Sequence, residues 1–489
     1  MLPPLPPFLR RHGFALVFTA LLAGCFLVHA HYRQRYIGAV DWYGYYQEGL
    51  LFKAGRATLP TELPAATFPS VVPFGFSVLA DGRVVPQYPP GFPLLIAAAA
   101  FFNFEFYLMP LVGLASCLIL FQLIRDLTRD RVTAALYAVL WAFFPIVVFG
   151  STTIMSDLVA ALFVFTSYWL YRRGQVFWSA FALTFALCVR PTNVLYLLVF
   201  AVVLLRDGRL VRYGLGMVLP GAIYGFYNYS LYGAPWRTGY FDIRSDLVAG
   251  VFVPHLGFYL WQVLLQFSPL VLLLCLWGFR KPRGEKIFFA AWFAVFLLFY
   301  CFWRSGGDRW WWTRFLLPGF APVFLLSALG FSRMRTLLEE RLAHGPKRFA
   351  AQAALFVLIG VTPVYYFKFG LDQHDLWSTN KGYDYYKIVK ETEKSVPPGS
   401  YVGSVEFAGS FRLYTGLGSY VSVHDNSPRL VDYVQAQGHE AFVIVEPWNQ
   451  TNEVVRQLLR RYAAVKVRDL TTWGGAPLPL YRLDAPATP

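Results

Sequence analysis

The stretch Asp41-Trp-Tyr-Gly-Tyr-Tyr-Gln-Glu48 follows the first long apolar segment almost at once and puts two acids among four aromatic residues. Trp and Tyr gather where a segment leaves a bilayer, since their rings suit the interface between hydrocarbon and water. This explains the aromatic residues but not Asp41, which has no Lys or Arg within five residues. A carboxylate at a membrane edge is costly unless it is solvated, paired or used, so we expect Asp41 to be functional.

The composition indicates a polytopic α-helical membrane protein. Of the 489 residues, 56% are hydrophobic and only 15% are charged, whereas soluble domains carry about 25% charged residues. The formal charge of +15 does not indicate a nucleic-acid partner, because the basic residues form short clusters between apolar segments. Such clusters are topology signals and contacts for anionic membrane lipids.

The cysteines and the N-terminus add two further limits. All five cysteines fall inside apolar segments, so the sequence shows neither a disulfide framework nor a metal-ligand spacing. The first apolar segment follows Arg10-Arg11 and resembles a signal peptide, but no small-residue cleavage site comes after it. We therefore interpret it as a retained first span with the N-terminus in the cytoplasm.

Apolar segments near the length of about 17 to 25 residues that crosses a bilayer predict about eleven transmembrane helices. The three segments that begin at residues 158, 176 and 192 are the shortest. The predicted spans are residues 14–30, 106–124, 132–149, 158–171, 176–189, 192–205, 213–230, 256–279, 287–303, 315–331 and 350–367.

Five basic clusters, each separated from the next by two spans, all fall on the cytoplasmic side under this count. The apolar segment 91–102 is too short to cross, and with 41–54 it predicts short helices that lie on the bundle or the membrane surface. We therefore expect a transmembrane domain at 1–369, with a large first outer loop at 31–105. The protein would lie in the cell (inner) membrane.

The composition changes after the last span, and residues 370–489 predict a small α/β domain on the outer, periplasmic face. Helices are expected at 383–395, 429–437 and 453–461. Strands are expected at 401–405, 441–445 and 464–467. We expect this domain to bind or orient an acceptor, although a role as a packing lid is equally compatible with the sequence.

Several charged and aromatic residues gather on the predicted outer face. Arginine is disfavoured in short outer loops, so the arginines there need partners. Ordinary ion pairs with the acids are one reading, and binding of an anion such as phosphate is the other, since the guanidinium fork suits phosphate oxygens. The residues concerned are Asp41, Glu48, Tyr88, Asp157, Arg190, Tyr240, Arg304, Asp308, Arg309 and Arg314.

Acids, arginines and aromatic rings at a membrane edge fit the transfer of a sugar from a lipid phosphate. A carboxylate takes the proton of the acceptor hydroxyl as general base. Arginines stabilise the charge that grows on the departing phosphate. Of the four arginines, Arg314 is the first candidate for the phosphate, because it immediately precedes an apolar span.

At this point the sequence resembles the GT-C membrane glycosyltransferases, the group with the aminoarabinose transferases and protein O-mannosyltransferases. The resemblance covers about residues 10 to 330. Each motif is weak alone, but their order and spacing are more specific. The motifs are Asp41-Trp-Tyr-Gly-Tyr-Tyr, Tyr88-Pro-Pro-Gly-Phe-Pro, Met155-Ser-Asp157, Arg190-Pro-Thr-Asn, Tyr232-Gly-Ala-Pro with Thr238-Gly-Tyr240, and Arg314-Phe-Leu-Leu-Pro318.

The resemblance implies an active site at the outer membrane face, a polyprenyl- or dolichyl-phosphate sugar donor and inverting transfer. Asp41 matches the catalytic acid of the family and Asp157 its second acidic position. A single Asp41 stands where protein mannosyltransferases carry an Asp-Glu pair, which favours a lipid or glycan acceptor over a protein. No cofactor is predicted, and a divalent metal held by Asp41 and Asp157 is left open. The tryptophan run Trp310-Trp-Trp312 has no assigned place.

Two other functions compete with a glycosyltransferase. A transporter or lipid flippase needs ionisable groups near the middle of the membrane, and the centres of the predicted spans are nearly free of charge. A non-catalytic assembly or sensor protein would need Asp41 only as a residue that reaches the membrane surface. Whether Asp41, Tyr88 and Asp157 face a common cavity would discriminate between these functions.

Overall fold

The computed structural model describes residues 7–240, 243–342, 345–373, 376–447, 449–471 and 477–484. The chain divides into two compact units. The helical unit comprises Met1–Arg33, Tyr107–Tyr224 and Asp242–Thr379. The mixed unit comprises Gln34–Phe106, Gly225–Phe241 and Asn380–Pro489.

These units group the chain differently from the predicted division at residues 369 and 370, because Gln34–Phe106 falls in one unit with the C-terminal residues. Helix α2 (Val40–Lys53) lies on α18 (Ala408–Tyr414). The ring of Tyr43 fits there only because residue 409 is glycine, since a Cβ at Gly409 would lie 2.4 Å from it. The backbone N–H of Ile37 also donates to the Tyr414 hydroxyl at 2.6 Å.

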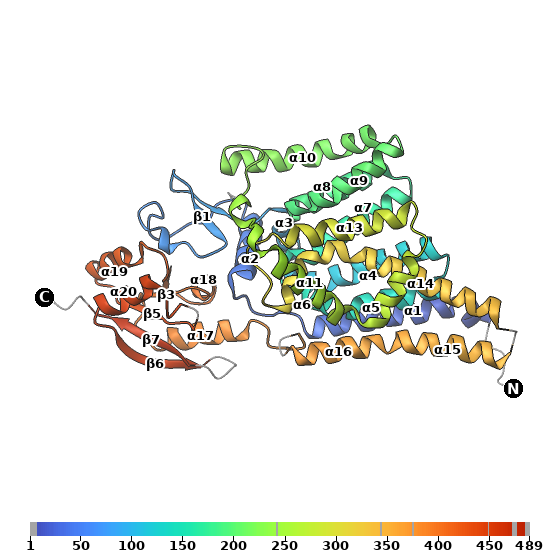
Figure 1. The fold of residues 1–489 in the computed structure, drawn as a ribbon. Helices are drawn as coiled ribbons and strands as arrows, with labels where there is room; N and C mark the ends of the chain where they lie inside the picture. Colours follow the sequence, from blue (N-terminus) through green and yellow to red (C-terminus); the bar gives the residue numbers. More distant parts are fainter. Residues whose placement is uncertain are drawn as a thin grey trace. The chain divides into compact units, whose positions relative to one another are not determined.

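The helical unit is a bundle whose long helices run side by side (Figure 1). Helix α10 begins in this unit and ends in the mixed unit. The α-helices are α1 (Pro7–His31), α4 (Leu108–Thr128), α5 (Arg131–Phe143), α6 (Pro145–Thr152), α7 (Ser156–Arg172), α8 (Val176–Val189), α9 (Val194–Arg206), α10 (Leu210–Tyr232), α11 (Phe252–Phe267), α12 (Pro269–Phe279), α13 (Glu285–Tyr300), α14 (Leu317–Arg341), α15 (Pro346–Gly360) and α16 (Thr362–Asp372).

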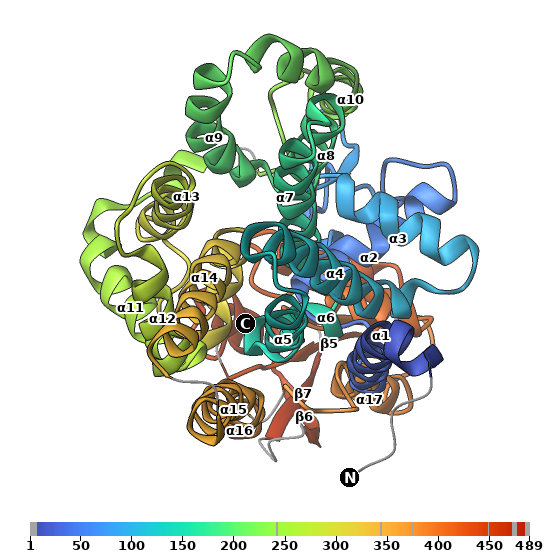
Figure 2. The same ribbon diagram turned by 90° about the vertical axis from the view of Figure 1, so that its right-hand side faces the viewer.

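Helices α12 and α14 make the closest approach in the bundle, which is seen end-on in Figure 2. A Cβ at Gly278 would lie 1.8 Å from the carbonyl oxygen of Leu326. A Cβ at Gly330 would lie 1.9 Å from that of Leu274. Small residues allow two backbones to meet in this way, which is how helices associate in an apolar solvent.

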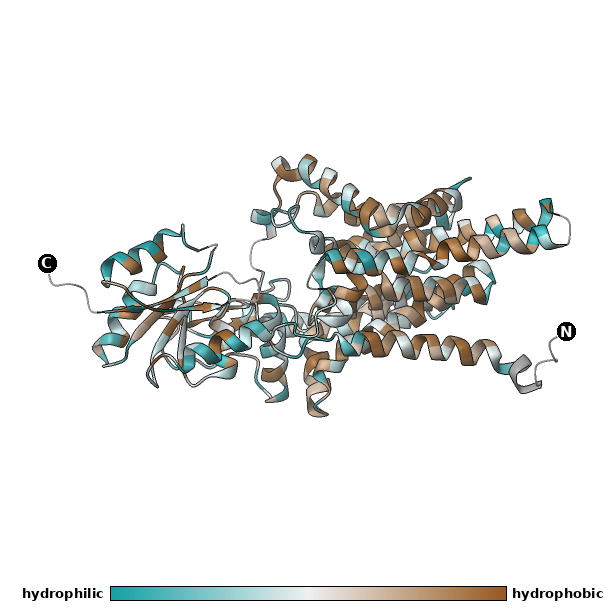
Figure 3. Cartoon of the chain, turned by 90° about the horizontal axis from the view of Figure 1, so that it is seen from below, coloured by the Kyte–Doolittle hydropathy of each residue, from teal (hydrophilic) through white to brown (hydrophobic). Residues whose placement is uncertain are grey.

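Four helices of the described chain are long and apolar enough to cross a membrane, or up to six if each bent pair is one span. Apolar residues cover most of the bundle in Figure 3, whereas the helices beside the sheet carry hydrophilic faces. The four are His12–His31, Glu105–Thr128, Trp310–Arg341 and Pro346–Asp372, and the bent pairs are Arg131–Phe143 with Pro145–Thr152 and Ala249–Phe267 with Pro269–Phe279.

The predicted count of eleven spans is therefore not confirmed. The other five predicted spans form α7, α8, α9, α10 and α13. Four of these have 13 to 17 residues, and at 1.5 Å per residue they fall short of a hydrocarbon core of about 30 Å. Helix α10 has 23 residues, but its tyrosines and glycines lower its hydropathy.

The mixed unit combines two short helices and a hairpin from the first outer loop with a five-stranded sheet from the C-terminal part. The two short helices were predicted from the sequence and are present. The elements are α2, β1 (Phe76–Val78), β2 (Val84–Pro86), α3 (Gly91–Phe101), α17 (Tyr383–Glu393), β3 (Tyr401–Ser404), α18, β4 (Gly418–Val421), α19 (Ser427–Ala436), β5 (Ala441–Ile444), α20 (Glu453–Arg461), β6 (Val465–Thr471) and β7 (Pro477–Leu483).

The sheet has the order β4-β3-β5-β7-β6. Strand β3 is parallel to β4 and β5, and β7 is antiparallel to β5 and β6. Val402, Phe442 and Leu480 lie in the core beneath the helices. The three expected strands and three expected helices of this region are present; α20 has the predicted bounds, and the other five differ at one or both ends. Strands β4 and β7 and helix α18 were not predicted.

Candidate functional site

Asp41 lies in the first turn of α2, where the partial positive charge of the helix N-terminus favours a carboxylate. The preceding residue but one, Ala39, has a φ of 52°, so the chain turns sharply before the helix begins. Asp41 is half-buried. It is therefore held by a regular element and retains access to solvent.

The hydroxyl group of Tyr88 donates a hydrogen bond of 2.6 Å to Oδ1 of Asp41. Tyr88 reaches the acid by crossing α2 at Gly44, where an added Cβ would lie 2.2 Å from the Tyr88 ring. On the same side, the backbone of Gly75 packs directly on Gly44. The two glycines therefore make the approach of Tyr88 to Asp41 sterically feasible.

Aromatic rings surround Tyr88 and keep it protonated. The centroid of the Tyr45 ring lies 4.2 Å from that of Tyr88, and the Tyr240 ring lies 6.2 Å away in an edge-on arrangement. Burial, followed by the neighbouring charge of Asp41, raises the pKa of Tyr88 well above its usual value. Tyr88 is thus a permanent hydrogen-bond donor to Asp41.

The motif from Tyr232 to Tyr240 packs on the backbone that leads to Tyr88. The Tyr232 hydroxyl donates to the carbonyl oxygen of Pro86 at 2.8 Å. A Cβ at Gly239 would lie 2.4 Å from the same oxygen. Two motifs of the family resemblance, separated widely in the sequence, therefore meet within the mixed unit.

Glu48, two turns after Asp41, has a different environment. It is fully buried and accepts a hydrogen bond of 3.0 Å from the Tyr227 hydroxyl at Oε1. Burial raises the pKa of its carboxyl group well above the usual range. Burial therefore favours the neutral form of Glu48 in the interior of the mixed unit.

Asp157 occupies the first turn of α7 in the helical unit, and two arginines meet it there. Nη1 of Arg190 donates to Oδ1 of Asp157 at 2.5 Å. Nε of Arg314 lies 3.7 Å from Oδ2. The side chain of Asp157 is 3% exposed, that of Arg314 7% and that of Arg190 15%, so the ion pairs are buried.

Local backbone structure positions both arginines. Helix α8 ends at Val189, and the extended backbone of Arg190 leads into a 3₁₀ turn, Pro191–Asn193. The Asn193 side chain donates to the carbonyl oxygens of Ala186 and Arg190, at 2.8 and 3.0 Å, and so joins the turn to the end of α8. Arg314 belongs to a second 3₁₀ segment, Trp310–Leu316.

Two residues of the tryptophan run that the sequence left unassigned lie beside Arg314. The guanidinium carbon of Arg314 lies 4.6 Å from the ring centroid of Trp311 and 4.9 Å from that of Trp312. The ring of Phe315 lies 5.0 Å from the guanidinium carbons of both Arg314 and Arg190. Cations over aromatic faces are stabilised electrostatically, so these rings fix the orientation of both guanidinium groups.

The other charged residues predicted for this site lie apart from Asp157. Arg304, Asp308 and Arg309 are exposed. Asp308 accepts a hydrogen bond of 2.6 Å from Nε1 of Trp312, and its contact with Arg309 is a 3.9 Å surface pair. Of the four predicted arginines, the structure brings together Arg190 and Arg314.

The described residues include no group of three or more His, Cys, Asp or Glu side chains that could hold a metal ion. The structure also shows residues that sequence reasoning missed. These are Gly75, which no motif contained, and Gly44, Tyr45 and Phe315, which lay inside the quoted motifs but were not predicted as site residues. A glycine inside the aromatic run of α2 was the signal for a close approach of another segment, whereas Phe315 had no distinguishing signal.

Comparison with known proteins shows the fold. No family model and no curated protein matches the chain. The fold is that of the GT-C membrane glycosyltransferases, as the sequence resemblance predicted.

Among the similar solved structures is ArnT from Cupriavidus metallidurans bound to undecaprenyl phosphate. It has a TM-score of 0.61 and 14% identity, over 97% of this chain and 100% of that one. The archaeal oligosaccharyltransferase AglB from Archaeoglobus fulgidus, in complex with an inhibitory peptide and a dolichol-phosphate, is also similar. Its TM-score is 0.53 and its identity 12%, over 94% of this chain and 74% of that one.

Proposed function

We propose that the protein is an integral-membrane glycosyltransferase that moves a sugar from a polyprenyl-phosphate donor to a lipid or glycan of the cell envelope. The transfer takes place on the outer face of the inner membrane and inverts the anomeric centre. The GT-C fold supports this proposal, as do the undecaprenyl phosphate and dolichol-phosphate in two of the similar structures. The transferred sugar is a hexose or a pentose.

The observation that carries the proposal is the half-exposed Asp41 carboxylate, held by a Tyr88 hydroxyl that stays protonated. In the reaction the acceptor oxygen attacks the anomeric carbon from the side opposite the phosphate. Its proton passes to Asp41, and the bond between the anomeric carbon and the phosphate oxygen breaks. Polyprenyl phosphate leaves with the bonding electron pair.

Arg314 and Arg190 are assigned to the phosphate of the donor. Their guanidinium groups are oriented by Asp157 and by aromatic rings. A rigid fork suits two phosphate oxygens at once and stabilises the charge that develops on the leaving group. In this assignment Asp157 positions the arginines and takes no proton.

A donor-turnover assay tests the proposal. Purified protein in lipid nanodiscs is incubated with polyprenyl-phosphate hexoses and pentoses and with a delipidated envelope extract, and released polyprenyl phosphate is measured. We expect release with wild-type protein and almost none with Asp41→Asn. Movement of intact donor across the bilayer without release would instead identify a flippase. If the protein shows neither activity, the non-catalytic function remains.

The orientation is a separate part of the proposal. We place the N-terminus in the cytoplasm and the C-terminal residues outside, because the basic clusters require this under the predicted spans. A reporter fused after Pro489 should be active only outside the cytoplasm. A reporter active inside would reverse the assignment of the two faces.

A further inference from the structure

Residues 61–68 of the first outer loop run past the C-terminal sheet within the mixed unit and leave two hollows beside it. The first has a volume of about 480 Å³ and the second about 900 Å³, solvent at their mouths included. Neither includes Asp41 or Tyr88.

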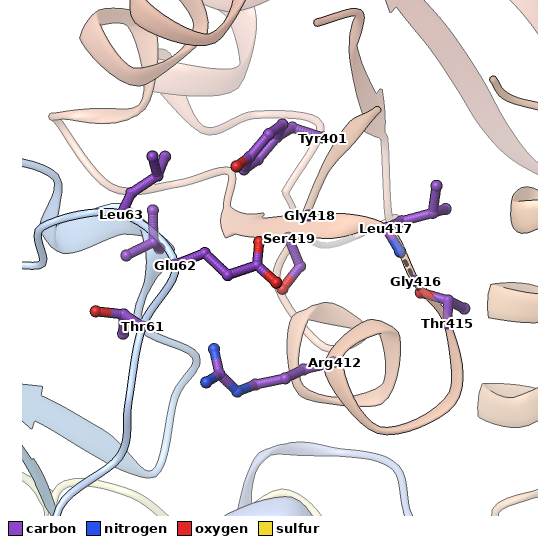
Figure 4. Close-up of a pocket in the computed structure, with 11 residues that line it drawn as sticks. Thr61, Glu62, Leu63, Tyr401, Arg412, Thr415, Gly416, Leu417, Gly418 and Ser419 are labelled. Carbon is purple, nitrogen blue, oxygen red and sulfur yellow. Dashed lines mark hydrogen bonds between the residues drawn. The ribbon is translucent and has the colours of Figure 1, made fainter. Parts of the chain in front are cut away.

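The first hollow combines an acid, a base and an aromatic ring (Figure 4). Glu62 from the loop, Arg412 from α18 and Tyr401 from the start of β3 line it, together with the hydroxyl group of Ser419. Tyr401 lies against the backbone of β4 because residue 418 is glycine, where a Cβ would lie 2.4 Å from its ring. The ring therefore forms a wall of the hollow.

Glu62 and Arg412, both described residues, face the same hollow without forming an ion pair with each other. The guanidinium of Arg412 donates to the carbonyl oxygen of Pro60, which holds it at the edge. An anion would be attracted by Arg412 but repelled by Glu62. A cation would be attracted by Glu62 but repelled by Arg412. A hydroxyl group satisfies both, because it donates to the carboxylate and accepts from the guanidinium.

The second hollow repeats this chemistry. Arg429, Asp432 and Tyr433 of α19 line it opposite Phe68 of the loop. Asp432 also accepts hydrogen bonds from Arg461 and from the Tyr462 hydroxyl, each at 2.6 Å. Arg429 and Tyr433 are exposed and line the hollow from the helix surface.

The two hollows are neighbours. Residues 61–63 line the first hollow, and Pro64, Thr67 and Phe68, which follow them in the chain, line the second. Burial raises the pKa of Tyr401 in the first hollow, and the next contributions come from Glu62 and Tyr433. Because the lining residues of the two hollows follow one another in the chain, one ligand can extend along residues 61–68.

We propose that the two hollows are adjacent subsites for a neutral glycan of at least two sugar residues. Aromatic rings present apolar faces to the pyranose rings, and the charged groups accept and donate hydrogen bonds to the hydroxyls. The inference rests on the proposed function in one respect, because this glycan is taken to be part of the acceptor. It assigns the acceptor to the carbohydrate class.

Ligand-observed NMR tests the proposal with the full chain in nanodiscs and an array of neutral mono- and disaccharides of hexoses and N-acetylhexosamines. We expect disaccharides to bind more tightly than their monosaccharides. Gly416→Leu adds a bulky side chain to the lining of the first hollow, at a position where a Cβ meets nothing within 4 Å. This variant and Arg412→Ala should each weaken disaccharide binding about tenfold or more, as expected when bonds to a charged group are lost.

Tyr433→Ala should remove the preference for disaccharides and leave monosaccharide binding unchanged, because it alters the second hollow alone. Arg456→Ala, an exposed residue of α20, is the matched control and should bind as wild type. Absence of binding across the array, binding of short-chain prenyl-phosphate sugars or of zwitterionic amino acids in place of saccharides, or binding that survives Gly416→Leu and Arg412→Ala would each overturn the proposal.

The same samples separate this inference from the proposed function. Asp41→Asn protein should bind saccharides as wild type does while it releases no polyprenyl phosphate. If the wild-type protein binds saccharides but never turns over donor, the saccharide subsites are supported and the transferase function is refuted. If it turns over donor but binds no saccharide, the transferase function is supported and the subsites are refuted.

Discussion

Asp41 and Asp157 are the same side chain in the same place, the first turn of a helix, yet their surroundings differ. Asp41 is half-buried and accepts a bond from the neutral hydroxyl of Tyr88. Asp157 is almost fully buried and accepts from Arg190, with Arg314 nearby. The surroundings therefore differ in kind, with an acid open to solvent in one unit and an acid paired with arginines in the other.

The strongest test of this difference is Asp41→Asn. The amide keeps the shape and the bond from Tyr88 but takes no proton, so sugar transfer should fall by about 10²–10⁴-fold, the usual contribution of a general base. Donor turnover measures the effect, and an unchanged thermal unfolding temperature shows that the fold is intact. Transfer within a few-fold of wild type would remove Asp41 as the base.

Asp157→Asn should act on stability. Removing one partner of a buried ion pair leaves uncompensated charge, which typically costs about 3–5 kcal/mol. We expect a clearly lower unfolding temperature, measured in detergent beside Asp308→Asn as the exposed control. An Asp157→Asn protein as stable as wild type would contradict the positioning role.

Arg314→Lys separates charge from geometry. Lysine keeps the positive charge but loses the planar fork and its stacking on the tryptophan rings. The specificity constant for the donor should fall by about tenfold or more, since each bond to a charged group is worth about 1.5–3 kcal/mol. Arg309→Lys, at an exposed position, should leave it unchanged. Equal values for the two variants would clear Arg314 of the phosphate role.

Glu48→Gln should have the smallest effect on transfer, because burial raises the pKa of Glu48 and so favours the neutral form, which the amide resembles. The effect on stability depends on pH. A raised folded pKa gives stability that is full below the unfolded value of 4.5 and is lost as the pH rises towards the folded value. Wild-type protein should therefore lose unfolding temperature relative to the variant as the pH rises above 4.5. A constant difference would show that Glu48 is ionised.

The sequence predicted individual helices and strands better than it predicted how they group into membrane spans and compact units. Periodicity located α2, α3 and most of the C-terminal helices and strands, because apolar spacing is a local property. Topology by basic clusters required eleven spans, whereas helices such as α8 and α13 are short enough that packing, not length, keeps them in the bundle. Strand β7 was not predicted because it contains Pro477 and Pro479, and proline is uncommon within strands.

The candidate site shows the same limit. Asp41, Tyr88, Asp157, Arg190 and Arg314 could be named because their residue types are unusual at a membrane edge. Which of them bond to each other could not, since that depends on backbone approaches. Gly44 admits Tyr88 to Asp41, and Phe315 lies beside both arginines. Arg304 and Arg309 had the same sequence signal and stay at the surface.

The hydrogen bond between Ile37 and Tyr414 joins residues 377 positions apart in the chain. The chain must close a loop of this length before such a contact can form. The ribosome makes Tyr414 long after Asp41, so the residues that surround Asp41 are synthesised in stages. The bond to Tyr88 forms across 47 residues, the one from Tyr227 to Glu48 needs 179, and the anchor of α2 on α18 comes last. A truncated chain that ends before residue 408 carries the proposed general base without the support that orients its helix.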